Sequence, residues 1–168
     1  GSEMCIRDSD SGLRRGEVVS LESKNIFMHN NTMLVQGKGE KERLVPFGEE
    51  TKRYINRYSH MRNEYEKRFF QKEDGTPITD NTIKMYFQDL KESTGIIRLH
   101  PHLLRHTFAT NYILYGGDVE ELRILLGHTS LQMTMKYVHL ATQQRILNQR
   151  YHSHIDKLFC QYDNKLAQ

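Results

Sequence analysis

The chain has 168 residues, 37% of them hydrophobic, which is enough for about one domain with a buried core. Its net charge of +3 is only mildly basic, so charge alone does not identify nucleic acid as a partner. No apolar run approaches the roughly 20 residues that span a bilayer, and no secretory signal is found, so we expect a cytoplasmic protein without a membrane anchor. Cys5 and Cys160 lie near opposite ends, and their spacing predicts neither a disulfide framework nor a zinc site.

The first ten residues look foreign to the fold, because they begin with Gly-Ser, which resembles the remnant of a cloning tag, and then show no helical or strand periodicity. We therefore interpret residues 1–10 as a tag or non-native leader. Ser11 is a suitable N-cap for a helix that reaches Leu21. That helix would hold Arg14 in its first turn, where free backbone N–H groups and the helix dipole favour an anion.

A small antiparallel sheet is predicted next. Three runs rich in strand-forming residues lie at 25–28, 32–36 and 43–47, and turn residues separate them at 29–31 and 37–40. The sheet therefore has three strands near the N-terminus, with Lys38 in its second turn.

The remainder of the sequence predicts helices, so we expect an α+β fold that is mostly α-helical. Apolar residues at helical spacing, together with capping residues, give the expected bounds. The helices run from 49 to about 68, from 81 to 93, from 101 to the glycines at 116–117, from a capping box at 118–121 to Gly127, from a capping box at 129–132 to Tyr137, and from 142 to 168. The first is expected to bury a stripe of Tyr54, Ile55, Tyr58 and Met61.

Five short motifs carry side chains suited to phosphate chemistry. They are Ser-Gly-Leu-Arg-Arg-Gly-Glu at 11–17, Gly-Lys-Gly at 37–39, His-Leu-Leu-Arg-His at 102–106, Leu-Gly-His at 126–128 and Lys-Tyr-Val-His at 136–139. We expect each motif to present its functional side chain to solvent or to a ligand. Each is common by itself, but their order and spacing resemble the catalytic domain of tyrosine recombinases, the phage-integrase family of the lambda-integrase type. The resemblance implies that catalytic domain over residues 11–141 and a tail helix over residues 142–168.

The resemblance also implies an activity. Members of this family cut double-stranded DNA one strand at a time through a covalent 3′-phosphotyrosine, and pass the strand to a partner's 5′-hydroxyl within a tetramer, without a metal or other cofactor. A phenol is far more acidic than a sugar hydroxyl, so the phosphotyrosine bond is readily attacked and the step is reversible. The implied role is DNA integration or excision for a phage or mobile element. Members usually carry a separate N-terminal DNA-clamping domain, which we expect to be missing from this chain.

Through this resemblance, the motifs give named residues catalytic roles. Tyr137 is the expected nucleophile. Arg14 and Arg105 are expected to clamp the scissile phosphate, since each guanidinium can donate two parallel hydrogen bonds to phosphate oxygens. Glu17 lies one helical turn after Arg14 and is expected to orient that arginine rather than to transfer protons.

Two histidines complete the expected phosphate site. His102 lies in the first turn of its helix, three residues before Arg105, so that both can meet one anion. His128 follows the helix-ending Gly127 and is expected to hydrogen-bond the phosphate. His102 and His106 also have the i, i+4 spacing of zinc ligands, but no glutamate of the metalloprotease type accompanies them, and we interpret His106 as structural, with no metal bound.

The second turn of the sheet is expected to touch DNA. Lys38, between two glycines, is the expected general acid that protonates the departing 5′-oxygen, with Lys41 as its rival on the same hairpin. Lys41 and Arg43 are expected to bind DNA. Glu40 and Glu42 interleave with these cations and could neutralise them, so the family resemblance, and not the charge pattern, favours phosphate contact here.

Two other functions stay open on the sequence. A type IB topoisomerase uses similar chemistry as a monomer, although the compact spacing from His102 to Tyr137 and the tail helix favour a recombinase. A non-catalytic helical DNA-binding domain would leave the tyrosine and both histidines unexplained. The tail either packs on its own domain or, as the resemblance implies, is exchanged with a neighbouring subunit.

Overall fold

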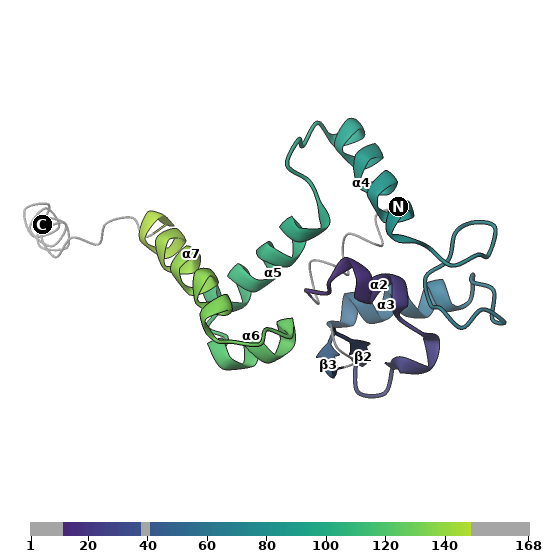
Figure 1. Cartoon of the computed structure of the whole chain (residues 1–168), viewed down its shortest axis with the longest axis horizontal. Helices are drawn as coiled ribbons and strands as arrows, with labels where there is room; N and C mark the ends of the chain where they lie inside the picture. Colours follow the sequence, from purple (N-terminus) through teal and green to yellow (C-terminus); the bar gives the residue numbers. More distant parts are fainter. Residues whose placement is uncertain (1–11, 38–40, 149–168) are drawn as a thin grey trace, which may run out of the picture.

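The computed structural model describes residues 12–37 and 41–148. Within them the chain is mostly helical, with a three-stranded antiparallel sheet near its N-terminus, as the sequence predicts (Figure 1). The elements are α2 (Arg15–Ser20), a 3₁₀ turn η1 (Ser23–Asn25), β1 (Ile26–Phe27), β2 (Thr32–Gln36), β3 (Glu42–Pro46), α3 (Glu49–Ser59), α4 (Asp80–Thr94), α5 (Pro101–Leu114), α6 (Val119–Leu126) and α7 (Gln132–Asn148). Among the described residues, no helix combines the length and the apolar character needed to cross a membrane.

The sheet has the order β1-β2-β3, and β2 and β3 bury side chains on one shared face. Met33 lies opposite Val45, and Val35 lies opposite Arg43. Because side chains alternate along a strand, Arg43 and Val45 point to the same face, and Val45 is fully buried. β2 has the predicted bounds, whereas β1 and β3 differ from the predicted strands by one residue at each end.

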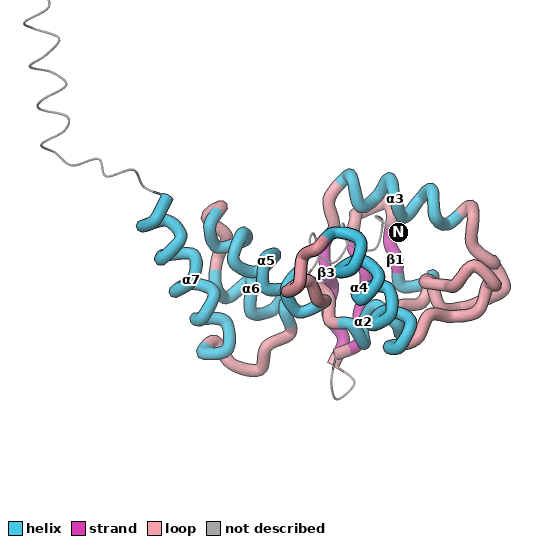
Figure 2. Tube along the Cα trace, turned by 90° about the horizontal axis from the view of Figure 1, so that it is seen from above, coloured by secondary structure: helices cyan, strands magenta, loops and turns pink. Residues whose placement is uncertain are grey.

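Two clusters of buried side chains divide the fold. The larger lies among α2, the sheet, α3 and α4, and the smaller lies among α5, α6 and α7. Figures 1 and 2 show these two groups of elements side by side, joined by the segment between α4 and α5. Hydrogen bonds from arginines of the first group and of α5 converge on the end of α6, at the boundary between the clusters.

The helix predicted for residues 49–68 is wrong in its second half, because α3 ends at Ser59. Beyond it, Arg62 donates hydrogen bonds to three backbone carbonyls of the following loop, which turns the chain back on itself. The Phe69 amide then donates to the Leu21 carbonyl at 2.8 Å. The residues after Ser59, which the sequence predicts as helix, therefore form a loop. This loop carries Phe69 into the core.

The buried stripe expected on this helix is correspondingly shorter. Ile55 is buried, and Tyr54 and Tyr58 are half-buried. Met61 is 76% exposed, because it lies beyond the end of the helix.

The next helices confirm their predicted bounds closely. Pro101 occupies the first turn of α5, where its missing N–H costs nothing. The Asp118 carboxylate caps α6 by accepting from two backbone N–H groups at 2.8 and 3.0 Å. The Glu121 carboxylate, expected to complete a capping box, accepts a hydrogen bond from the Tyr112 hydroxyl at 2.8 Å. Gly127 ends α6 in the left-handed conformation.

The helix that carries Tyr137 is longer than predicted. It begins at Gln132 and runs to Asn148, because no proline or glycine follows the tyrosine before that point. It therefore includes the first residues of the predicted tail helix, where Arg145 donates hydrogen bonds to the last two carbonyls of α5. Residues 149–168 of that predicted tail lie outside the described part of the chain.

Candidate active site

The start of α2 places Arg14 beside the end of α6. Arg14 is the N-cap residue of α2 and not, as predicted, part of its first turn, because the helix begins at Arg15. Gly12 precedes it with a left-handed backbone (φ 62°), and an added Cβ there would collide with the Phe108 ring. Glycine therefore suits this position both by its backbone conformation and by the space left beside Phe108. Ser11, the predicted cap, lies outside the described residues.

Glu17 is the buried acid of this site. Its carboxylate accepts hydrogen bonds from the backbone N–H and the Nη1 of Arg14, at 2.7 and 3.1 Å, and from Nη1 and Nη2 of Arg43, at 2.7 and 2.9 Å. Burial alone would raise the pKa of this carboxyl, but the hydrogen bonds and charges of Arg43 and Arg14 outweigh burial and lower it. Glu17 is thus ionised and holds both guanidiniums in place.

Four consecutive carbonyls at the end of α6 each accept a hydrogen bond from an arginine. Arg43 Nε donates to Leu125 O (2.7 Å), Arg105 Nη2 to Leu126 O (2.6 Å), Arg14 Nη2 to Gly127 O (2.9 Å) and Arg123 Nη1 to His128 O (2.9 Å). The last carbonyls of a helix lack intrahelical partners and lie at the negative end of its dipole, so they attract cations. The end of α6 therefore gathers arginines from β3, α5, the α2 cap and its own last turn.

Gly127 lets the guanidiniums approach this closely. Its backbone has φ 61°, and a Cβ there would lie 3.1 Å from Nη1 of Arg43 and 3.3 Å from Nη1 of Arg14. Two features therefore require glycine at this position: the left-handed backbone conformation and the close packing of two arginine side chains.

Arg105 is the most enclosed cation of the site. Its guanidinium also donates to the Gly12 carbonyl at 2.5 Å, and its side chain is buried. Burial, followed by repulsion from Arg14, lowers its pKa to about 10, although the charge of Glu17 opposes this shift. Arg105 is still protonated at neutral pH. With Arg14 and Arg43 it gives three positive charges against the one of Glu17, which suits the site to an anion.

His128 lies between Arg105 and the helix of the tyrosine. Its Nε2 lies 3.4 Å from Nη2 of Arg105, and its Nδ1 lies 2.9 Å from the hydroxyl of Thr134. Its ring stacks on Tyr137, with centroids 6.3 Å apart and planes inclined by 11°. Burial, followed by the charges of Arg105 and Arg14, lowers the pKa of His128 to about 4, so the imidazole is neutral at pH 7.

Tyr137 is 2% exposed and belongs to the smaller core. The ring of His106 lies 5.3 Å from its centroid, and Lys136 Nζ lies 4.9 Å above it. We expect each motif to present its side chain to solvent or to a ligand, and for Tyr137, Arg105 and His128 solvent is not the partner, because all three are buried. Apolar positions on α5, α6 and α7 form one core, and these polar side chains line its edge.

His102 is exposed on the first turn of α5, with its ring 6.4 Å from that of His100. His106, one turn later, is half-buried, and burial followed by the charge of Lys136 lowers its pKa. His106 thus contacts the ring of Tyr137, whereas the ring contact of His102 is with His100. Among the described residues, no group of three or more histidines, cysteines and carboxylates could hold a metal ion.

The hairpin residues are placed differently from one another. Lys38 lies outside the described residues. Lys41 is exposed, and its carbonyl accepts a hydrogen bond from the Gly37 amide at 2.8 Å. Arg43, expected to face DNA, turns into the domain, because its strand position puts it on the buried face and Glu17 pairs with it there. The alternation with Val45 was the signal in the sequence that could have shown this.

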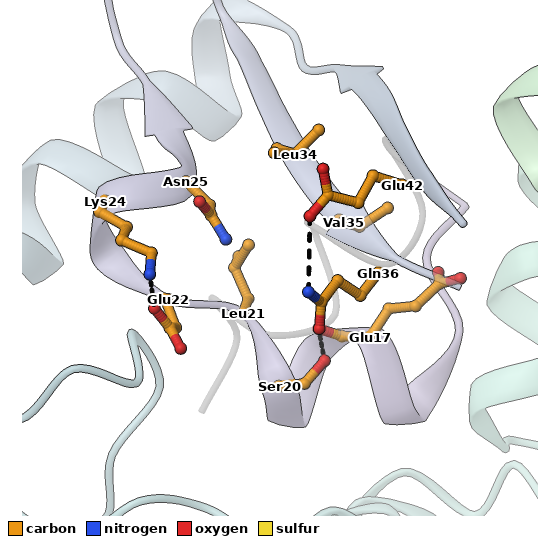
Figure 3. A pocket seen from close by; sticks show the side chains of 10 residues that line it. All are labelled: Glu17, Ser20, Leu21, Glu22, Lys24, Asn25, Leu34, Val35, Gln36 and Glu42. Atoms are coloured by element: carbon orange, nitrogen blue, oxygen red, sulfur yellow. Dashed lines mark hydrogen bonds and ion pairs between the residues drawn. The ribbon is translucent and has the colours of Figure 1, made fainter. Parts of the chain in front are cut away.

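A separate hollow of about 100 Å³ lies between α2, η1 and the β2–β3 hairpin. Figure 3 shows that Glu17 borders it but directs its carboxylate away from the other lining side chains. The hollow is therefore distinct from the arginine site on the other side of α2.

Comparisons with known proteins agree with this geometry. The sequence profile described as the phage integrase family matches residues 9–144. Tyrosine recombinase XerC of Staphylococcus haemolyticus (strain JCSC1435) is 35% identical over 139 residues, which cover 80% of this chain and 47% of that protein. Tyrosine recombinase XerC of Bacillus pumilus (strain SAFR-032) is 32% identical over 159 residues, covering 89% of this chain and 52% of that protein. The chain thus spans about half the length of these relatives.

Solved structures share the fold. The crystal structure of XerA recombinase matches with a TM-score of 0.77 at 28% identity, over 88% of this chain and 57% of that one. The catalytic domain of bacteriophage HP1 integrase matches with a TM-score of 0.62 over 89% of this chain and 83% of that one. Its identity is 22%, so this likeness concerns the fold alone.

Proposed function

The chain belongs to the phage integrase family, and we propose that it is the catalytic domain of a site-specific tyrosine recombinase. In this proposal it cuts and rejoins double-stranded DNA through a covalent 3′-phosphotyrosine, without a metal or other cofactor, in the cytoplasm. The observation that carries the proposal is the convergence of Arg14, Arg105 and His128 on the end of α6, with Tyr137 stacked against His128.

The two arginines supply the charge that the reaction needs. As the tyrosine oxygen attacks, negative charge grows on the non-bridging oxygens of the phosphate, and aligned N–H donors stabilise it. The N–H groups of Arg14 and Arg105 now donate to carbonyls of α6 and of Gly12. A phosphate carries a full negative charge where a carbonyl carries a partial one, so it would compete for these donors. Glu17 and Arg43 keep Arg14 in position for that exchange.

Lys38 is the proposed general acid, which protonates the departing 5′-oxygen. The hairpin that bears it is anchored by Arg43 to Glu17 and to Leu125, so its base is tied to the arginine site. Lys41, which is exposed on the same hairpin, is the alternative acid and a DNA contact.

Burial of Tyr137 implies that attack on DNA requires a rearrangement of α7. The helix continues for 11 residues after the tyrosine, to Asn148. Its exposed apolar side chains Leu140, Ile146 and Leu147 would gain from contact with another surface. We propose that the tail beyond them is exchanged with a neighbouring subunit in a tetramer on DNA, which would couple cleavage to assembly. The parent protein would add an N-terminal domain that clamps DNA.

Trapping of the covalent intermediate tests this function. Duplexes bound by the 168-residue chain are selected from a random-sequence pool and are then nicked next to each candidate scissile phosphate, so that the short cut product diffuses away. A recombinase gives a protein–DNA adduct that survives denaturation and maps to Tyr137. Binding without any adduct would support a non-catalytic DNA-binding domain instead, and adducts formed by a strictly monomeric protein would support topoisomerase-like chemistry.

A further inference from the structure

Thr134 contacts His128 from the side opposite to Arg105. Its hydroxyl lies 2.9 Å from Nδ1 of His128, and its side chain is completely buried. It lies on α7, one turn before Tyr137. Thr134 therefore connects His128 to the helix that carries the proposed nucleophile.

The two neighbours of His128 determine which ring nitrogen carries the proton. A neutral imidazole has one N–H, and an arginine can only donate hydrogen bonds. Nε2, 3.4 Å from Nη2 of Arg105, must therefore act as the acceptor, which leaves the proton on Nδ1. Nδ1–H then donates to the Thr134 hydroxyl oxygen. In this arrangement His128 has no proton to offer to a phosphate at Nε2.

A phosphate oxygen next to Nε2 requires the opposite tautomer, because such an oxygen can only accept hydrogen bonds. If the proposed function holds and a phosphate displaces the Arg105 N–H from Nε2, then Nε2 must donate and Nδ1 of the neutral ring must accept. Among side chains of this size, a hydroxyl is suited to both situations, since it donates as well as accepts and rotates freely about its C–O bond.

We infer that Thr134 is a positioning residue that allows His128 to exchange its Nδ1–H tautomer for the Nε2–H tautomer when phosphate binds. The exchange requires no net proton: water removes one proton from Nδ1 and delivers one to Nε2, and the Thr134 hydroxyl turns to donate to Nδ1. This inference rests on the proposed function, but it concerns a residue outside the five sequence motifs. Burial of the ring, which keeps the imidazole neutral at pH 7, agrees with it.

Two substitutions separate this role from simple packing. Thr134→Val keeps the volume and removes the hydroxyl, whereas Thr134→Ser keeps the hydroxyl and leaves a gap in the core. If Thr134 orients His128, Thr134→Val slows adduct formation by about a hundredfold to a thousandfold, the range expected when an aligned donor to a phosphate oxygen is lost. Thr134→Ser then stays close to the wild-type rate despite a lower melting temperature. A packing role predicts the opposite order, with the serine variant slower, and that order would overturn the inference.

Thr51→Val, at an equally buried threonine in the other core, controls for the loss of a buried hydroxyl.

The tautomer itself is read by ¹⁵N NMR of histidine-labelled protein at pH 7, without ligand and with inorganic phosphate or the selected duplex. We expect Nδ1–H in the free protein, Nε2–H with either probe, and no such change in Thr134→Val. Persistence of Nδ1–H with both probes, protonation of both nitrogens, or the same change in the valine variant would each overturn the inference. If no duplex gives an adduct, the proposed function fails, yet the response to inorganic phosphate still decides the role of Thr134.

Discussion

Arg43 and Glu17 form an ion pair that is almost closed to solvent, with side-chain exposures of 9% and 3%. Both carboxylate oxygens accept from Arg43, at 2.7 and 2.9 Å, and the same carboxylate holds Arg14. The pair therefore fastens the β2–β3 hairpin to α2 and fixes one of the two proposed phosphate-binding arginines.

Removing one partner of this pair should be much more harmful than removing both. Arg43→Met leaves a buried carboxylate with Arg14 as its remaining cation, and we expect a loss of about 3–5 kcal/mol in the free energy of unfolding. Arg43→Met combined with Glu17→Gln should regain most of that loss. Urea denaturation of the two single variants and the double variant measures the coupling, and equal losses in single and double variants would contradict it. Arg53→Met, in the exposed pair with Glu50, should change stability by less than about 0.5 kcal/mol.

Tyr137→Phe should abolish adduct formation while leaving the fold and DNA binding intact. The ring, which packs in the smaller core, is retained, and only the attacking oxygen is lost. Denaturing gels of suicide substrates measure the adduct, and gel shifts measure binding. Tyr112→Phe is the matched control, because it removes a hydroxyl that bonds to Glu121 instead. An adduct that persists in Tyr137→Phe would assign the nucleophile to another residue.

Stability should fall as the pH drops from about 6.5 to about 4. The folded pKa of His128 is lowered to about 4 from its usual 6.5 by burial and by nearby arginines, so the unfolded chain binds more protons in this window. At about 1.36 kcal/mol per pKa unit, the loss is on the order of 3 kcal/mol at most. The lowered pKa of His106 acts with the same sign. Urea unfolding at pH 7.5 and 4.5 should show a smaller pH-dependent loss in His128→Gln than in wild type, and identical losses would refute the assignment.

Cleavage by the Lys38→Ala variant should be restored on a DNA substrate whose leaving group needs no general acid. On a duplex with a 5′-bridging phosphorothiolate, sulfur leaves without protonation, so this variant should regain most of the cleavage that it loses on ordinary DNA. Arg105→Ala should not be rescued, because its role is to stabilise the phosphate oxygens. Single-turnover cleavage rates on both substrates provide the comparison. Rescue of Lys41→Ala in place of Lys38→Ala would transfer the role to Lys41.

Gly127→Ala should damage both the fold and the reaction. The left-handed backbone costs a non-glycine residue about 1–2 kcal/mol, and the added Cβ would press on the guanidiniums of Arg43 and Arg14. The melting temperature and the rate of adduct formation should both fall. Gly16→Ala is the control, because Gly16 is helical and its added Cβ would meet no atom within 4 Å. A Gly127→Ala protein that matches this control would exclude the proposed crowding.

Much of this protein follows from local features of its sequence. The period of two in residues 32–36, the turn glycines and the caps at Pro101 and Asp118 predict the sheet and the helices α5 and α6. The helix predicted from local periodicity is wrong beyond Ser59, because contacts distant in sequence determine the structure there. Phe69 bonds to Leu21 and is buried in the core instead of continuing α3.

The tertiary structure alone decided how the site is assembled. Arg43 and Leu125 are 82 positions apart, and Arg14 and Gly127 are 113 apart, so no local pattern relates them. The unpaired carbonyls at the end of α6 attract these arginines only once two cores have packed side by side, and Tyr137 is buried within the smaller of these cores. The sequence motifs identify the proposed reactive side chains, because phosphate chemistry requires particular residue types. The hydrogen-bond partners of these side chains depend on long-range packing, which the periodicity of the sequence does not encode.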